Sequence, residues 1–148
     1  MAAVTRRIEA SPEAVFAVLA DGWRYSNWVV GTSHMQAVES EWPAAGSRLY
    51  HCSGAWPVVT RDETVVEESA PNRKLVLLAK GGVLGSARVV LELEPAGDGT
   101  IVSLAEEPVA GFGKWAHNPV LDRVLARRNV EALARLAALS ERHTKPMP

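Results

Sequence analysis

Cysteine is nearly absent from this sequence, which contains Cys52 alone. One cysteine cannot form an intramolecular disulfide, so the fold does not depend on an oxidising compartment. Long apolar runs are absent too, and none approaches the ~20 residues that a membrane span requires. The first residues lack the apolar core and cleavage site of a signal peptide. We therefore expect a soluble, cytoplasmic protein that does not insert into a membrane.

An excess of positive charge is also absent, because 16 Lys and Arg residues are matched by 17 Asp and Glu residues. The formal net charge of −1 predicts no basic face of the kind that nucleic-acid binding needs. The sequence has no polybasic run that would favour an anionic membrane surface. Nucleic-acid binding is therefore excluded from the expected functions.

Metal-binding motifs are missing as well, since the sequence has no HxH, HExxH or CxxC spacing. His34, His51 and His117 fall in different predicted elements. His51 and Cys52 are adjacent in a strand, so their side chains point to opposite faces and cannot share one ion. We predict no metal and no cofactor.

The 148 residues have the usual length of one domain, and we expect residues 1–148 to form a single unit. A chain of this length buries about 70% of its unfolded surface without help from a metal or a disulfide. Polar residues and two prolines at 143–148 predict a flexible tail.

Most of the chain has the pattern of β-strands separated by turn residues. We predict strands at 3–9, 32–39, 47–52, 57–68, 74–80, 86–94 and 100–107. Short turns between successive strands require antiparallel pairing. Two short helical segments follow the first strand, and Ser11 with Pro12 suits the start of the first.

A long helix is predicted from Asn118-Pro119 to about Arg142. A sheet of about seven strands cannot leave its inner face open, so it must curl around this last helix. The fold class is therefore α+β, with a curved antiparallel sheet wrapped around the C-terminal helix and room for an apolar pocket between them.

The sequence resembles the START-like, helix-grip superfamily (SRPBCC), and within it the polyketide cyclase/dehydrase-type proteins. The resemblance covers nearly the whole chain and rests on three segments with Asp21 and Trp28 between the first two: 8–16 (IEASPEAVF), 65–75 (VVEESAPNRKL) and 93–102 (LEPAGDGTIV). Residues 117–129 resemble an uncharacterised bacterial subgroup. The resemblance implies the helix-grip fold and a cavity for a small molecule. The superfamily includes polyketide cyclases, lipid and hormone carriers and quinone-binding proteins.

Arg128 is the most informative candidate for chemistry. On a helical wheel it falls in the middle of an apolar stripe, which consists of Leu121, Val124, Leu125, Ala132, Leu136 and Leu139. An arginine aimed into an apolar pocket is costly unless a carboxylate or a ligand meets it. It can anchor a carboxylate, enolate or phenolate oxygen of a ligand, or it can form a structural ion pair with an inward glutamate.

Glu106 is a candidate partner of Arg128 or a candidate base, because alternation puts it on one strand face with Val102 and Leu104. A solvated strand end is the alternative. His51 shares a face with Leu49, which suggests an inward position. His51 and His34 are candidates for a general base, and a structural histidine is the alternative for each.

Five tryptophans are many for this length, and they suggest a pocket that stacks on planar ligands. We expect the ligand to be contacted by Trp28, Trp56 and Trp115, by His34 and His51, and by Leu121, Leu125 and Arg128 of the last helix. Core and loop packing is the alternative, and it is our expectation for Trp23 and Trp42.

Two glycine-containing segments, 81–85 and 108–115, are candidate gates of the pocket because glycines permit hinge motion. Plain turns are the alternative. Neither segment has the GxxxxGK[ST] pattern of a phosphate-binding loop.

Three functions fit the sequence. The first is binding of a hydrophobic or aromatic small molecule in an internal cavity, by a monomer or a homodimer. The second is an enzyme of the polyketide cyclase, aromatase or dehydratase type, with Arg128, His51 and Glu106 as catalytic candidates. The third is an interaction or regulatory module with a vestigial pocket.

Overall fold

The computed structural model of the chain describes residues 2–55, 58–80, 85–110 and 119–142. Its main element is a seven-stranded antiparallel sheet with the strand order β1-β7-β6-β5-β4-β3-β2. The strands are β1 (Ala2–Ile8), β2 (Thr32–Val38), β3 (Arg48–Ala55), β4 (Val58–Ala70), β5 (Lys74–Lys80), β6 (Ser86–Ala96) and β7 (Gly99–Ala110). The predicted number of strands and the predicted antiparallel pairing are confirmed.

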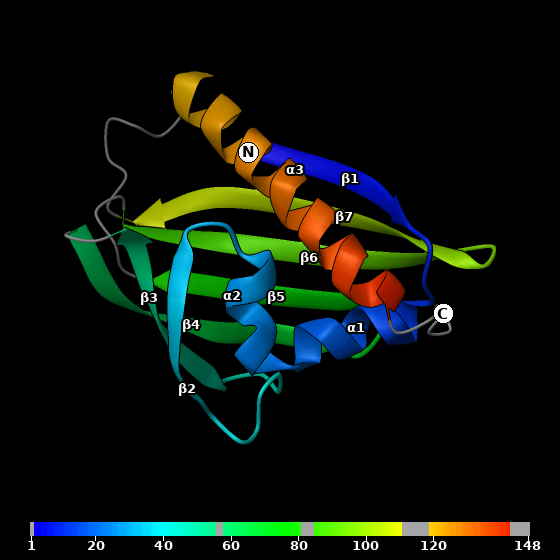
Figure 1. Ribbon diagram of the computed structural model, residues 1–148, viewed down its shortest axis with the longest axis horizontal. Helices are drawn as coiled ribbons and strands as arrows, with labels where there is room; N and C mark the ends of the chain where they lie inside the picture. The colour runs from blue at the N-terminus through cyan, green and yellow to red at the C-terminus, as the bar shows by residue number, and fades with distance from the viewer. Residues whose placement is uncertain (1, 56–57, 81–84, 111–118, 143–148) are drawn as a thin grey trace.

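The helices all lie on one side of this curved sheet (Figure 1). After β1 come α1 (Pro12–Ala20), a short 3-10 turn η1 (Gly22–Arg24) and α2 (Tyr25–Trp28). The long helix α3 (Pro119–Arg142) ends the described chain and crosses the face of the sheet. α3 packs mainly against β1 and also contacts β7, α1 and α2. The predicted α+β helix-grip architecture is therefore confirmed.

The start of α1 follows from its first residues. The Ala14 backbone N–H donates to the Ser11 hydroxyl oxygen at 3.1 Å, and Pro12 occupies the first turn, where no N–H is needed. Glu13 adds a negative charge at the positive end of the helix. Val15, Phe16, Val18 and Leu19 make up its buried face. Asn118, at which the long helix was predicted to begin, lies outside the described residues.

The core lies between the concave face of the sheet and the three helices. Its fully buried leucines come from β3, β5, β6, β7, α1 and α3: Leu19, Leu49, Leu75, Leu77, Leu91, Leu104, Leu133 and Leu136. No helix in the described part of the chain has the length and hydrophobicity needed to span a membrane.

The buried face of α3 differs from the predicted stripe. Val124 is 56% exposed, so its predicted place on the apolar side was wrong. The buried face instead carries Leu125, Asn129, Ala132, Leu133, Leu136, Ala137 and Ser140. Because Leu133 and Ala137 are part of this face, its centre falls at Asn129 and not at Arg128, which is half-buried at its edge.

The tryptophans in the described part of the chain have different environments. Trp42 is buried and its indole N–H donates to the Leu19 backbone oxygen at 3.1 Å, so its predicted packing role is confirmed. Trp23 is 57% exposed, and the prediction that it packs in the core was wrong. Trp56 and Trp115 lie outside the described residues.

Candidate functional site

Three strands carry polar side chains among the apolar residues of their buried face. His51 follows Leu49 on β3, Thr64 precedes Val66 on β4, and Glu106 follows Leu104 on β7. Residues two apart on a strand share one face of the sheet, so these polar groups lie on the same side as the core leucines. His51 and Glu106 are each 4% exposed, so His51 lies inward as its face suggested, and Glu106 has the inward position and not the solvated strand end that was its alternative.

The Thr64 hydroxyl links two rings in the interior. The Tyr25 hydroxyl and the His51 Nε2 atom each lie 3.1 Å from the Thr64 Oγ1 atom. The Tyr25 and His51 rings are also in contact, with centroids 5.1 Å apart. A helix residue and two strand residues thus form one buried hydrogen-bonded group.

Burial keeps both rings uncharged at neutral pH. Loss of water around the Tyr25 hydroxyl raises its pKa to about 12, and the hydrogen bond from Thr64 opposes this shift. Burial also lowers the pKa of His51 below its ordinary value of 6.5, while the nearby charge of Asp62 opposes that change. Neutral imidazole and neutral phenol are therefore the forms that this site presents.

Arg128 and Glu106 form an ion pair between α3 and β7. The Glu106 side chain is only 5% exposed, whereas that of Arg128 is 36% exposed. The guanidinium therefore reaches into the core from the edge of the helix and neutralises a deeply buried carboxylate. The sequence left two roles open for Arg128, an anchor for a ligand oxygen and a structural ion pair with an inward glutamate, and the structure contains the ion pair.

Three buried polar atoms have no hydrogen-bond partner among the described residues. They are the Asp62 Oδ1, Glu106 Oε1 and Asn129 Nδ2 atoms. Buried polar atoms in native proteins nearly always have a partner, and an exception calls for an explanation such as a bound water or ligand. The charges of Glu106, Arg128 and Asp62 all act on the Tyr25 hydroxyl.

Trp28 adds an aromatic surface beside the polar cluster, by which we mean Tyr25, His51 and Thr64 together with the charged groups of Asp62, Glu106 and Arg128 that act on Tyr25. The Trp28 side chain is 3% exposed and meets the Tyr25 ring edge-on, with centroids 5.5 Å apart. Leu125, also predicted to contact the ligand, is buried on α3. The Trp28 ring thus gives the polar cluster an adjoining aromatic surface.

Several other predicted site residues lie elsewhere. His34 is exposed on β2, the edge strand next to β3, so it is not brought together with the polar cluster. Trp56, Trp115 and the side chain of Leu121 lie outside the described residues. The two candidate gates, 81–85 and 108–115, also fall largely outside them.

Sequence reasoning missed Tyr25, Asp62, Thr64 and Asn129. Asn129 stands at the centre of the apolar face of α3, and a wheel that included Leu133 and Ala137 would have singled it out. Asp62 and Thr64 lie on β4, which has apolar residues on both faces, so its alternation does not identify the inward side. Tyr25 lies in the one-turn helix α2, too short for any periodic pattern.

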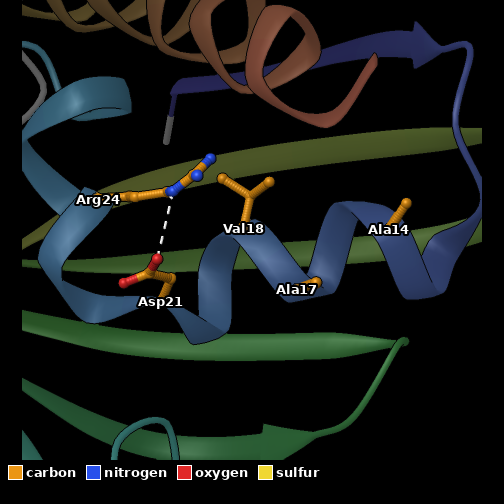
Figure 2. A pocket seen from close by; sticks show the side chains of 5 residues that line it. All are labelled: Ala14, Ala17, Val18, Asp21 and Arg24. Carbon is orange, nitrogen blue, oxygen red and sulfur yellow. Dashed lines mark ion pairs between the residues drawn. The ribbon is translucent and has the colours of Figure 1, made fainter. Parts of the chain in front are cut away.

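A hollow of about 320 Å³ lies on the surface of α1 and η1 (Figure 2). Ala14, Ala17 and Val18 line it along α1. Asp21 and Arg24 face each other at its other end, with the Arg24 Nε atom 3.2 Å from the Asp21 Oδ2 atom. None of the residues of the polar cluster is among the five that line this hollow. The described residues contain no group of three or more His, Cys, Asp or Glu side chains suited to hold a metal ion.

The fold is similar to that of solved bacterial proteins. Protein NE0264 from Nitrosomonas europaea has a TM-score of 0.71 at 14% identity, over 96% of this chain and 94% of that one. TTHA0849 from Thermus thermophilus has a TM-score of 0.67 at 16% identity, over 97% and 99%.

A protein with a described role also has this fold. The di-domain ARO/CYC protein StfQ of the steffimycin biosynthetic pathway has a TM-score of 0.71 at 12% identity, over 96% of this chain and 51% of that one. Identities this low support the fold alone. No curated protein matches the chain. Residues 1–141 match the family described as polyketide cyclase / dehydrase and lipid transport, which confirms the resemblance read from the sequence. The chain belongs to the polyketide cyclase / dehydrase and lipid transport family.

Proposed function

We propose that this protein binds a hydrophobic or aromatic small molecule between the concave face of the sheet and α3. The observation that carries the proposal is the set of three buried polar atoms without partners in the described chain, Asp62 Oδ1, Glu106 Oε1 and Asn129 Nδ2. Leaving such an atom unpaired costs about 1–3 kcal/mol. A ligand that hydrogen-bonds to these atoms removes this cost, and its affinity is higher as a result. Trp28 and Leu125 supply apolar surface for the rest of the molecule.

The first test is native mass spectrometry of protein purified from its own host, followed by extraction and identification of any bound compound. We expect a stoichiometric aromatic or lipid-like molecule. Protein that is empty from its host, and that shows no thermal stabilisation by a library of aromatic and lipid compounds, would contradict the proposal.

The matched variants for this test are Asn129→Ala and Asn27→Ala. Asn129 is 4% exposed on the buried face of α3, whereas Asn27 is exposed on α2. Loss of a buried hydrogen bond to the ligand predicts an affinity about tenfold lower for Asn129→Ala. Asn27→Ala is expected to bind as the wild type does. Equal affinities in both variants would place the ligand elsewhere.

A cyclase or dehydratase activity is the second candidate, and one arrangement favours it. His51 and Asp62 are directly paired across β3 and β4, and the buried imidazole is in its neutral, proton-accepting form. A ligand proton within reach of this ring would have a base beside it. His51→Gln is the discriminating variant, because an enzyme should lose turnover and keep most of its affinity. A carrier should show no turnover at all and change only in affinity.

A further inference from the structure

The buried carboxylate of Glu106 is bonded at one oxygen and open at the other. Its Oε2 atom accepts from Arg128 Nη2, whereas its Oε1 atom is buried and has no hydrogen-bond partner within the part of the chain that the structure describes. The Glu106 side chain is 5% exposed and that of Arg128 is 36% exposed. The pair therefore runs from the edge of α3 into the interior. A carboxylate oxygen that has lost water needs a hydrogen-bond donor in its place.

The strand places this carboxylate on the concave face of the sheet. Glu106 follows Val102 and Leu104 on that face of β7, and both are core residues. Its partner across the β6 ladder is Val89, which packs against the core. These apolar side chains have no hydrogen bond to donate. The missing donor therefore fits a molecule that lies against the concave face.

Arg128 determines both the direction and the charge of the open oxygen. The two oxygens of a carboxylate are rigidly joined, so the hydrogen bond at Oε2 orients Oε1. One carboxylate and one guanidinium together carry no net charge. A cationic ligand would bring a charge without a partner into the interior, and a ligand carboxylate would offer no donor. A neutral O–H or N–H group satisfies Oε1 with neither disadvantage.

We infer that the ligand of this protein is a neutral aromatic or apolar molecule with an O–H or N–H group, and that this group donates to Glu106 Oε1. The inference rests on the proposed function, because it specifies the chemistry of the molecule bound at that same site. A hydrogen bond to an ionised acceptor is about twice as strong as one between neutral groups. An analogue without the donor leaves Oε1 buried and unpaired, so the site selects against it.

The test compares indole with benzofuran by isothermal titration calorimetry at pH 7. Both are neutral and have nearly the same shape, but the ring N–H of indole is a donor and the ring oxygen of benzofuran is an acceptor. Any difference in affinity therefore reports on the polar atom. We expect indole to bind at least about tenfold more tightly, which corresponds to one hydrogen bond to a charged acceptor.

Glu106→Gln is the diagnostic variant because it exchanges the open acceptor for a donor. Arg128 needs an acceptor, so the amide oxygen should face the guanidinium and the amide NH₂ group should take the place of Oε1. We expect benzofuran to bind this variant at least as tightly as indole does. Glu107→Gln is the matched control, since Glu107 lies on the opposite face of β7 and pairs with Arg88. It should keep the preference for indole.

A direct measurement covers the case in which Glu106→Gln does not fold. Nuclear magnetic resonance of ¹⁵N-labelled indole bound to the wild-type protein should show a nuclear Overhauser effect between the indole N–H proton and the side-chain methylene protons of Glu106. Bound indole without this signal would mean that its N–H points elsewhere, and the inference would be wrong.

The titrations separate the inference from the proposed function. Equal affinities of indole and benzofuran in the wild type, as an internal water at Oε1 would produce, overturn the inference while the binding function stands. A preference for indole that persists in Glu106→Gln overturns it as well. If neither compound binds at millimolar concentration, the proposed function and the inference fail together.

Discussion

At Tyr25 the fold changes the chemistry of a single side chain. It is 4% exposed, bonded to Thr64 and in contact with both Trp28 and His51. An ionised phenolate in this position would lose its hydration and lie near the negative charges of Glu106 and Asp62. The folded state therefore favours the protonated hydroxyl form of Tyr25.

The stability of the protein should fall at high pH because of this residue. The pKa of Tyr25 rises from 10 in the unfolded chain to about 12 in the folded protein. The contribution of Tyr25 to the free energy of unfolding is fully present below pH 10 and is lost as the pH rises toward 12. In that window the Tyr25 hydroxyl ionises in the unfolded chain but not in the folded protein. The predicted loss is about 3 kcal/mol, at about 1.4 kcal/mol for each unit of pKa difference.

Urea unfolding at pH 9 and at pH 11 measures this effect. Other groups titrate in the same range, so the informative quantity is the difference between the wild type and Tyr25→Phe. The variant lacks the titrating hydroxyl and should lose less stability than the wild type between the two pH values. An equal loss in both proteins would show that Tyr25 has an ordinary pKa.

At the scale of the elements, the start of α1 depends on one side chain, that of Ser11. The Ser11 hydroxyl accepts from the Ala14 N–H and satisfies one of the free donors at the start of a helix of nine residues. A helix this short has little stability of its own, so its cap and its packing against the sheet decide whether it forms.

We expect Ser11→Ala to lower the free energy of unfolding by about 1 kcal/mol, because the Ala14 N–H loses its partner. Chemical denaturation of the variant measures this loss. Ser11→Asp should restore most of it, since aspartate is an equally good cap. Ser40→Ala, at an exposed position, is the control and should change stability by less than about 0.5 kcal/mol. No loss in Ser11→Ala would mean that packing alone positions α1.

Element boundaries were largely predictable because strong local signals mark them. Lys74–Lys80 was predicted to the residue, since turn residues flank an apolar run on both sides. Thr32–Val38 and Ser86–Ala96 differ from prediction by one or two residues at one end. The rotation of α3 was not predictable to the same degree, because Val120 and Val124 are apolar and yet lie 68% and 56% exposed.

At the scale of the whole molecule, α3 is joined to the sheet by apolar packing and by the Arg128–Glu106 ion pair. Sequence alone suggested this pair because two charges stood on faces predicted to meet. It could not suggest the Tyr25–Thr64–His51 group, which brings together a helix and two strands whose mutual placement depends on the curvature of the sheet.

Arg128→Met tests how much this pair stabilises the fold. Removal of the guanidinium leaves Glu106 buried without compensation, and we expect a loss of about 1–3 kcal/mol, reduced from the fully buried case because Arg128 is partly exposed. Urea unfolding measures the loss. Arg127→Met, at the exposed neighbouring position, should change stability by less than about 0.5 kcal/mol.

The double variant Arg128→Met/Glu106→Gln completes the cycle. It removes both charges, so we expect it to be more stable than Arg128→Met alone. If the single variant is as stable as the wild type, the pair contributes nothing to the fold, and Arg128 would be available for a ligand after all.

The position of β1 in the sheet has a consequence for how the chain is made. Within the described chain β1 pairs only with β7, and its partners lie more than ninety residues further along the sequence. A ribosome therefore releases the first strand long before the strand that will cover its edge exists. Contacts this distant in sequence slow folding, because a large loop must close before they form. The nascent chain must keep an unpaired β1 edge from meeting another chain until β7 and α3 have been synthesised, and only then can the sheet and its interior be completed.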